Sequence, residues 1–280
     1  MGQMYWAGGR ACIGLREFHN AIALGELGLP YALKAKDWGT VGKLRLDVAG
    51  CFLAIGQTRD ARAYYEAYLL DLPRHREARK YEGRAHYNLG LLYRQVRKYD
   101  LAGAAYRQAL HCFVERGDTR DIGDTHQNVA WMHLMQRKPE EALTHIELAA
   151  SYRDRLPADF ETEQLVLLAF YHAAIGELKV ARDYLEPVRG GSVPATEAHL
   201  ACAKWVDAQV LARAGQWPKA QAALHEATDH ALNTRGIMMK RVVAMLLVVL
   251  SVLMVASVAS AENGVKFTSV GRGATTLSGR

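Results

Sequence analysis

The sequence has few of the features by which enzymes and metal-binding proteins are recognised. Its four cysteines, Cys12, Cys51, Cys112 and Cys202, include no C-x-x-C pair, and in a chain of 280 residues this spacing indicates neither a disulfide framework nor a zinc site. The sequence also lacks a Gly-rich phosphate-binding loop, a nucleophile elbow and the kinase motifs. We therefore predict a non-enzymatic protein without cofactor or metal, whose cysteines are reduced, small core residues.

The net positive charge is also small over most of the chain. The formal net charge of +6 would by itself suggest a nucleic-acid partner. Residues 238–280, however, hold five basic side chains and one acidic one, so +4 belongs to this region and +2 to residues 1–237. A nearly neutral body requires no polyanionic partner, and we predict no nucleic-acid binding by this chain. The first residues lack the basic start and apolar run of an export signal, which favours a cytoplasmic body.

A repeated segment, in contrast, occupies most of the sequence. The clearest copy, residues 86–110, reads HYNLGLLYRQVRKYDLAGAAYRQAL, and residues 126–150 follow the same pattern. The pattern is a leucine-glycine pair and an aromatic residue three positions later, then an alanine, an aromatic residue and a second alanine: Leu89, Gly90, Tyr93, Ala102, Tyr106 and Ala109. This pattern resembles the tetratricopeptide repeat, which is a hairpin of two antiparallel helices.

One alanine of the second helix recurs along the chain at intervals of 39 to 41 residues, as Ala21, Ala61, Ala102, Ala142, Ala181 and Ala220. Gly56, Gly176 and Gly215 each precede their alanine by five residues and are candidate turn residues. A single hairpin cannot bury its apolar stripe, so the hairpins must stack on one another. We therefore predict an all-α, right-handed superhelix over residues 1–236, with about six helical hairpins and a period near 40 residues.

The resemblance implies that the inner residues of the first helices contact an extended peptide or a partner helix. In the two clearest repeats it selects ten candidate peptide-binding residues: Arg84, Tyr87, Asn88, Leu91, Arg94, Gln95, Asp124, Gln127, Asn128 and Trp131. Asn88 and Asn128 occupy equivalent positions, and an asparagine amide both donates to and accepts from a peptide backbone.

Other side chains suggest the character of the groove. Trp131, Phe170 and Trp205 could supply apolar pockets, and the acids Asp47, Asp124 and Glu163 would suit a basic ligand. His126 and His133 lie two helical turns apart, as metal ligands can. Both fall on packing positions of the repeat, however, and we predict that they are core residues.

Residues 242–261 are an uncharged, apolar run of 20 residues. At ~1.5 Å per residue, a helix of this length just spans a ~30 Å hydrocarbon layer. Lys240 and Arg241 precede the run, so the positive-inside tendency would keep the body in the cytoplasm and send the tail outward. The run ends in ASVASA, an A-x-A pattern that predicts signal-peptidase cleavage after Ala261, with Ala259 and Ala261 at the site. We expect a signal-peptide-like or transmembrane helix at 237–261 and a flexible tail at 262–280.

Three interpretations of this tail remain open. The chain is a tail-anchored membrane protein, a precursor whose tail is cut off and released, or two adjacent reading frames written as one. The last two resemble the peptide-pheromone receptors of the Rap and PlcR kind in Gram-positive bacteria. Those cytoplasmic tetratricopeptide proteins are encoded beside a short exported precursor, whose product is re-imported and bound in the concave groove.

That resemblance implies a cytoplasmic quorum-sensing receptor or regulator joined to its own exported pro-peptide, with a ligand derived from residues 262–280. The alternative is a tail-anchored scaffold for the assembly of protein complexes, held in the membrane through residues 242–261. Rap- and PlcR-type receptors usually carry an N-terminal helix-turn-helix or three-helix bundle before the repeats. Here the repeats begin almost at Met1, so neither DNA binding nor the roles of that bundle are supported. Either the N-terminus is truncated or the body works through another partner.

Overall fold

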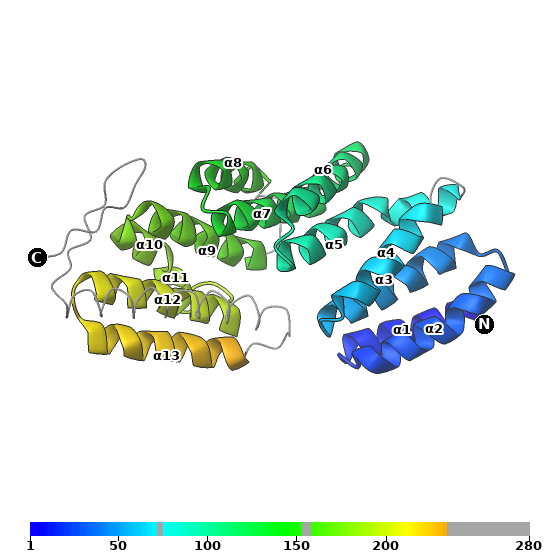
Figure 1. Ribbon diagram of the computed structural model, residues 1–280, viewed down its shortest axis with the longest axis horizontal. Helices are drawn as coiled ribbons and strands as arrows, with labels where there is room; N and C mark the ends of the chain where they lie inside the picture. The colour runs from blue at the N-terminus through cyan, green and yellow to red at the C-terminus, as the bar shows by residue number, and fades with distance from the viewer. Residues whose placement is uncertain (72–74, 153–157, 234–280) are drawn as a thin grey trace, which may run out of the picture.

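The computed structural model of the protein describes residues 1–71, 75–152 and 158–233 (Figure 1). All regular structure in these residues is helical, and consecutive helices pack as six antiparallel hairpins. The paired helices are α1 (Gly2–Gly14) and α2 (Phe18–Lys34), α3 (Trp38–Ala54) and α4 (Thr58–Asp71), α5 (Glu82–Gln95) and α6 (Tyr99–Arg116), α7 (Thr119–Met135) and α8 (Pro139–Ala150), α9 (Ala158–Ile175) and α10 (Leu178–Tyr184), and α12 (Glu197–Arg213) and α13 (Trp217–Asn233). A short helix, α11 (Glu186–Arg189), continues α10, and the 3-10 helix η2 (Arg76–Tyr81) precedes α5.

The hairpins follow one another along an arch. In Figure 1, α1 to α4 form one arm, α9 to α13 form the other, and α5 to α8 join the two arms. The first helices α5 and α7 lie on the inner side of the arch, whereas the second helices α6 and α8 lie on its outer side. This arrangement confirms the predicted all-α superhelix of stacked tetratricopeptide-like hairpins.

The same turn connects the two helices of every hairpin in the described chain. The residue five positions before the phased alanine has a positive φ in each case: Arg16 (62°), Gly56 (82°), Arg97 (58°), Arg137 (60°), Gly176 (96°) and Gly215 (70°). A residue in this left-handed conformation ends a helix, because it redirects the chain after the last helical turn. The sequence pattern identified the three glycines, while the three arginines adopt the same conformation against their intrinsic preference.

The phased alanines mark the start of the second helices. Each of them is the fourth residue of its helix, and its backbone N–H donates to the carbonyl four residues earlier. Ala21 is 3% exposed and the other five are fully buried, which confirms that these positions face the core. A methyl group at this point allows the two helix axes of a hairpin to approach closely.

A second close contact explains the leucine-glycine pair of the repeat. A Cβ atom on Gly90 of α5 would lie 2.5 Å from the ring of Tyr106 on α6. Tyr106 is 1% exposed, so its ring has no free space into which it can move. Glycine at this position therefore lets the aromatic ring of the second helix pack directly against the backbone of the first.

Apolar clusters join each hairpin to its neighbours. One of them combines side chains of α3 (Leu46, Ala49, Leu53), α4 (Ala61, Tyr65, Tyr68) and α5 (Ala85, Leu89, Leu92). Tyr65 and Tyr68 are at most 1% exposed, and complete burial of a large apolar side chain stabilises a fold by about 1.5–3 kcal/mol. The core is thus shared between hairpins, as the stacking argument requires.

The cysteines belong to this core rather than to a chemical site. Cys51 and Cys202 are buried, while Cys12 and Cys112 are half-buried, and all four are free thiols. Burial raises the pKa of Cys51 to about 11 and also raises the pKa of Cys202. Both thiols therefore stay protonated at neutral pH and behave as small apolar side chains.

The predicted segments after the repeats lie outside the described residues. These are the apolar run at 242–261, the cleavage site at Ala259 and Ala261, and the tail at 262–280. Within the part of the chain that the structure describes, no helix combines the length and the apolar character needed to cross a bilayer.

Candidate functional site

Polar contacts connect the first helices of successive hairpins. Trp6 Nε1 of α1 donates to Asp47 Oδ2 of α3 at 2.9 Å, and the carboxylate of Asp121 on α7 lies 3.9 Å from the guanidinium of Arg84 on α5. Asn128 Nδ2 of α7 donates to the Tyr87 hydroxyl of α5 at 2.9 Å. We give the name inner face to the residues of the first helices that are predicted to lie along a bound peptide: Asp47, Arg84, Tyr87, Asn88, Leu91, Arg94, Gln95, Asp124, Asn128, Trp131 and Glu163.

The two equivalent asparagines have different surroundings. Asn128 uses both amide hydrogens within the protein, because Nδ2 donates to the Tyr87 hydroxyl and, at 2.8 Å, to the carbonyl oxygen of Asp124. Its Oδ1 atom accepts no hydrogen bond from the described residues and remains available to a ligand N–H. Asn88 lies beside the hydroxyl of Tyr65; burial raises the pKa of Tyr65, and Asn88 is the strongest influence that opposes this rise.

The remaining predicted contact residues differ in how much surface they offer. Gln127 is only 5% exposed and donates to the Phe160 carbonyl oxygen at 3.3 Å and to Gln164 Oε1 at 3.4 Å, so it joins α7 to α9. Leu91 is half-buried against the cluster around Tyr106, and Arg94 and Gln95 are half-buried as well. Arg84 is exposed, with 60% of its side chain accessible.

The aromatic side chains form a stacked row instead of open pockets. The Trp131 and Phe170 rings meet edge to face at 5.0 Å, and Phe170 stacks on Trp205 at 4.6 Å. Phe170 and Trp205 are 7% and 9% exposed, which corrects the prediction that they line pockets for a ligand. Of the three, Trp131 alone keeps an appreciable accessible surface, and the row instead fastens α7, α9 and α12 together.

Glu163 is the centre of a polar cluster whose geometry sequence analysis did not reveal. Its Oε1 accepts from Trp131 Nε1 of α7 at 2.7 Å and its Oε2 from His199 Nε2 of α12 at 3.1 Å, so three first helices meet at one carboxylate. Burial tends to raise the pKa of Glu163. The hydrogen bonds from His199 and Trp131, together with the charges of protonated His199 and of Arg94, outweigh this effect. The pKa is lowered, and Glu163 is ionised at neutral pH.

Three histidines cluster inside the fourth hairpin. His126 Nδ1 and His145 Nδ1 are 3.0 Å apart, and the rings of His133 and His145 stack at 5.6 Å. Burial lowers the pKa of all three, and that of His145 falls to about 4, with the charges of its two neighbours contributing. The described residues contain no group of three or more side chains arranged to hold a metal ion. His126 and His133 pack within the hairpin, as their repeat positions predict.

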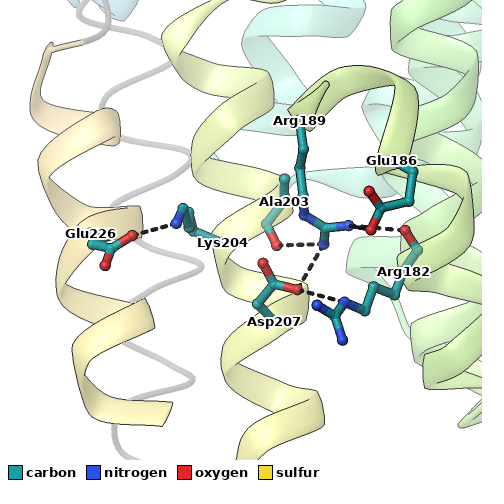
Figure 2. Close-up of polar contacts among 7 residues, drawn as sticks. All are labelled: Arg182, Glu186, Arg189, Ala203, Lys204, Asp207 and Glu226. Atoms are coloured by element: carbon teal, nitrogen blue, oxygen red, sulfur yellow. Dashed lines mark hydrogen bonds and ion pairs between the residues drawn. The ribbon is translucent and has the colours of Figure 1, made fainter. Parts of the chain in front are cut away.

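A hollow of about 350 Å³ lies between α10, α12 and α13. Of its charged lining residues, Arg182 contacts Asp207 at 3.4 Å and Lys204 pairs with Glu226, and Figure 2 shows that Arg189 of α11 also reaches Asp207, at 2.8 Å. Arg189 also donates to the Ala203 carbonyl oxygen and to Glu186. We interpret these contacts as structural contacts that connect the last two hairpins.

The sequence matches no protein-family model, and no curated protein matches it. The fold is nevertheless similar to that of several solved structures. The apo form of the quorum sensor NprR from B. thuringiensis aligns over 82% of this chain and 65% of its own, with a TM-score of 0.68 and 17% identity. The structure of NprR in complex with its cognate peptide NprX aligns over 89% of this chain and 72% of its own, with a TM-score of 0.63 and 17% identity.

Two other proteins share the fold. Apo RapI aligns over 82% of both chains, with a TM-score of 0.63 and 13% identity. BtubC from P. vanneervenii aligns over 94% of this chain and 98% of its own, with a TM-score of 0.59 and 18% identity. At these identities the likeness shows a common fold, and this chain spans slightly less than two thirds of the apo NprR chain.

Proposed function

We propose that this chain is a non-enzymatic receptor that binds an extended peptide along its inner face, and that it acts in the cytoplasm as a quorum-sensing regulator. The observation that carries the proposal is the likeness of its fold to NprR, a quorum sensor whose structure has been solved with a cognate peptide. The inner face adds chemical support, because it offers the free Oδ1 of Asn128, the exposed Arg84 and the ionised Glu163.

We propose further that the ligand comes from residues 262–280 of the same sequence. The A-x-A pattern at Ala259 and Ala261 would release this segment after export. The segment is short and carries three basic residues against one acid, Glu262. Its positive charge complements the acids of the inner face, Asp47, Asp124 and Glu163.

The apolar run at 242–261 also favours a second candidate, the tail-anchored scaffold. Both candidates use the inner face as the binding surface, but they differ in the fate of the polypeptide. Mass spectrometry of the native product separates them: a receptor with its own precursor yields a separate peptide that begins at Glu262, whereas an anchored scaffold yields one intact chain in the membrane fraction.

The direct test of peptide binding uses a chain that ends at Gly236, which keeps every described helix, and a synthetic peptide of residues 262–280. Circular dichroism first establishes that the shortened chain is folded. A peptide that binds only the folded state at 100 times its Kd should raise the free energy of unfolding by about 2.7 kcal/mol, seen as a higher melting temperature. A scrambled peptide of the same composition is the control. An unchanged melting temperature at millimolar peptide would contradict the proposal.

A paired substitution tests the role of the asparagines. Replacing Asn88 and Asn128 together by alanine should weaken peptide binding, because the peptide backbone loses hydrogen-bond partners worth about 0.5–1.5 kcal/mol each. Glu147→Ala, on the exposed surface of α8, is the control on a second helix. If the double variant and the parent chain bound the peptide with equal affinity, the two asparagines would not belong to the binding site.

A further inference from the structure

The charge of Glu163 has no lysine or arginine as a partner within the described protein. Trp131 donates to it through a neutral indole N–H. Two cations lower its pKa, protonated His199 and Arg94, and Arg94 forms no ion pair with it in the described part of the chain. The remaining question is whether His199 neutralises the carboxylate.

The start of α12 determines which ring nitrogen of His199 accepts a hydrogen bond and which donates one. The backbone N–H of Thr196 donates to His199 Nδ1 at 3.2 Å, and the backbone N–H of His199 donates to Thr196 Oγ1 at 3.4 Å, which together form a reciprocal capping box. A backbone N–H can only donate, so Nδ1 is an acceptor and the ring proton is on Nε2. We therefore assign His199 as the neutral tautomer, which donates to Glu163 without cancelling its charge.

The other acids of the inner face differ from Glu163 in this respect. Asp47 lies 3.4 Å from the guanidinium of Arg10, and burial raises its pKa. Asp124 lies 4.0 Å from the guanidinium of Arg120. Both carboxylates thus have a cation beside them. Glu163 is instead held in place by two neutral donors from flanking helices, with 28% of its side chain exposed.

We propose that Glu163 is the subsite that selects a cationic side chain, lysine or arginine, in the bound peptide; this inference rests on the proposed function. A carboxylate offers about four acceptor positions, and the protein occupies two of them. The unoccupied positions fit the N–H groups of an ammonium or guanidinium. The half-exposed indole of Trp131, which adjoins the carboxylate, provides an apolar surface for the methylene stem of such a side chain.

The test measures the affinity of two peptides for the full-length chain. The first is residues 262–280, and in the second Lys266, Arg272 and Arg280 are all replaced by glutamine. The same three replacements are made in the tail of the protein itself, so that its own cations do not compete. Fluorescence anisotropy gives the affinity of each labelled peptide for this parent chain, for its Glu163→Gln variant and for a Glu147→Gln control, all checked by circular dichroism.

We expect Glu163→Gln to weaken binding of the basic peptide about 10- to 100-fold, the range for a hydrogen bond to a charged group. The peptide with the three glutamine replacements should bind the parent chain and the Glu163→Gln variant with equal affinity. The control substitution Glu147→Gln should change the affinity of neither peptide. Equal affinity of the basic peptide for the parent and the Glu163→Gln variant overturns the subsite but leaves the receptor proposal intact. An equal loss for both peptides also overturns it, because Glu163 would then be structural. If neither peptide binds the parent chain saturably, the proposed peptide ligand is overturned, and the subsite with it.

Discussion

At the residue scale, the hairpin turns depend on a few residues in the left-handed backbone conformation. Glycine adopts this conformation without a steric penalty, whereas for other residues it costs roughly 1–2 kcal/mol. Gly215 has φ 70°, and a Cβ atom there would meet nothing within 4 Å, so only the backbone conformation opposes a side chain. Arg137 has φ 60° in the equivalent turn of the fourth hairpin.

These two turns predict opposite effects for opposite substitutions. Gly215→Ala should lower the free energy of unfolding by about 1 kcal/mol, because alanine is strained at this φ. Arg137→Gly should raise it by up to about 1 kcal/mol, because the strain is relieved. Urea-induced unfolding followed by circular dichroism measures both. A gain in stability for Gly215→Ala would show that the turn does not hold this conformation in solution.

The contact between Gly90 and Tyr106 leads to a second prediction at this scale. Helix propensity alone would make alanine more stable than glycine by about 1 kcal/mol within a helix. Gly90→Ala should nevertheless destabilise the protein by about 1–3 kcal/mol, because the new methyl group would overlap the buried Tyr106 ring.

A matched control is available in the facing helix. At Gly103 of α6 the nearest atoms to an added Cβ are 3.6 and 3.7 Å away, an ordinary contact distance. Gly103→Ala should therefore stabilise the protein, in agreement with propensity. Thermal or urea unfolding measures the stability of both variants relative to the parent. If both variants were more stable than the parent, the close packing of α5 on α6 would be excluded.

At the scale of the element, the fourth hairpin contains a group that responds to acid. The pKa of His145 on α8 is lowered to about 4 from an ordinary 6.5, first by burial and then by the charges of His126 and His133 on α7. His133 in turn is influenced by Glu141, which raises its pKa, and by Lys138, which lowers it. The folded hairpin therefore binds protons less readily than the unfolded chain.

This difference predicts the direction of a pH effect. As pH falls from about 6.5 towards 4, the unfolded chain takes up a proton at His145 and the folded chain does not, so stability decreases. The drop in melting temperature between pH 7 and pH 4.5 should be smaller in His145→Gln than in the parent. His225→Gln, at an exposed position of α13, is the control. If the melting temperatures of the parent and of His145→Gln fell in parallel with pH, His145 would not be the group with the lowered pKa.

The hairpins were predictable from sequence because their determinants are local. Each phased alanine proved to be the fourth residue of a second helix, and the turn glycines lie where their spacing from it predicts. The left-handed arginines could not be found in this way, since nothing in an arginine identifies the conformation. The break between α10 and α11 near Pro187 was also not predicted, although proline commonly occupies the first turn of a helix.

The candidate site was predictable only in part because its contacts connect distant repeats. Glu163 and His199 are 36 residues apart, and their hydrogen bond depends on how one hairpin stacks on the next. Phe170 and Trp205 were interpreted as pocket residues, but the same stacking buries their rings against each other. The one local signal for His199 was the capping residue Thr196, which indicates the start of a helix without identifying the partner of the imidazole.

At the scale of the whole molecule, the arch separates two kinds of surface. Polar and aromatic contacts connect the first helices from one hairpin to the next. The second helices α6 and α8 lie on the outer side of the arch (Figure 1). An extended peptide can contact several repeats at once on such a surface, and its affinity is then distributed over many contacts. We therefore expect the peptide to lie along the first helices of several hairpins.

The most direct test is to map the contacts of the peptide by photo-crosslinking. A peptide of residues 262–280 with a photoreactive phenylalanine at Phe267 is irradiated with the full-length chain, and the crosslinked residues are identified by mass spectrometry. The account predicts that the crosslinks fall on α3, α5, α7 or α9, near the inner face, and that unlabelled peptide abolishes them. Crosslinks confined to the second helices, or none that unlabelled peptide competes away, would contradict it.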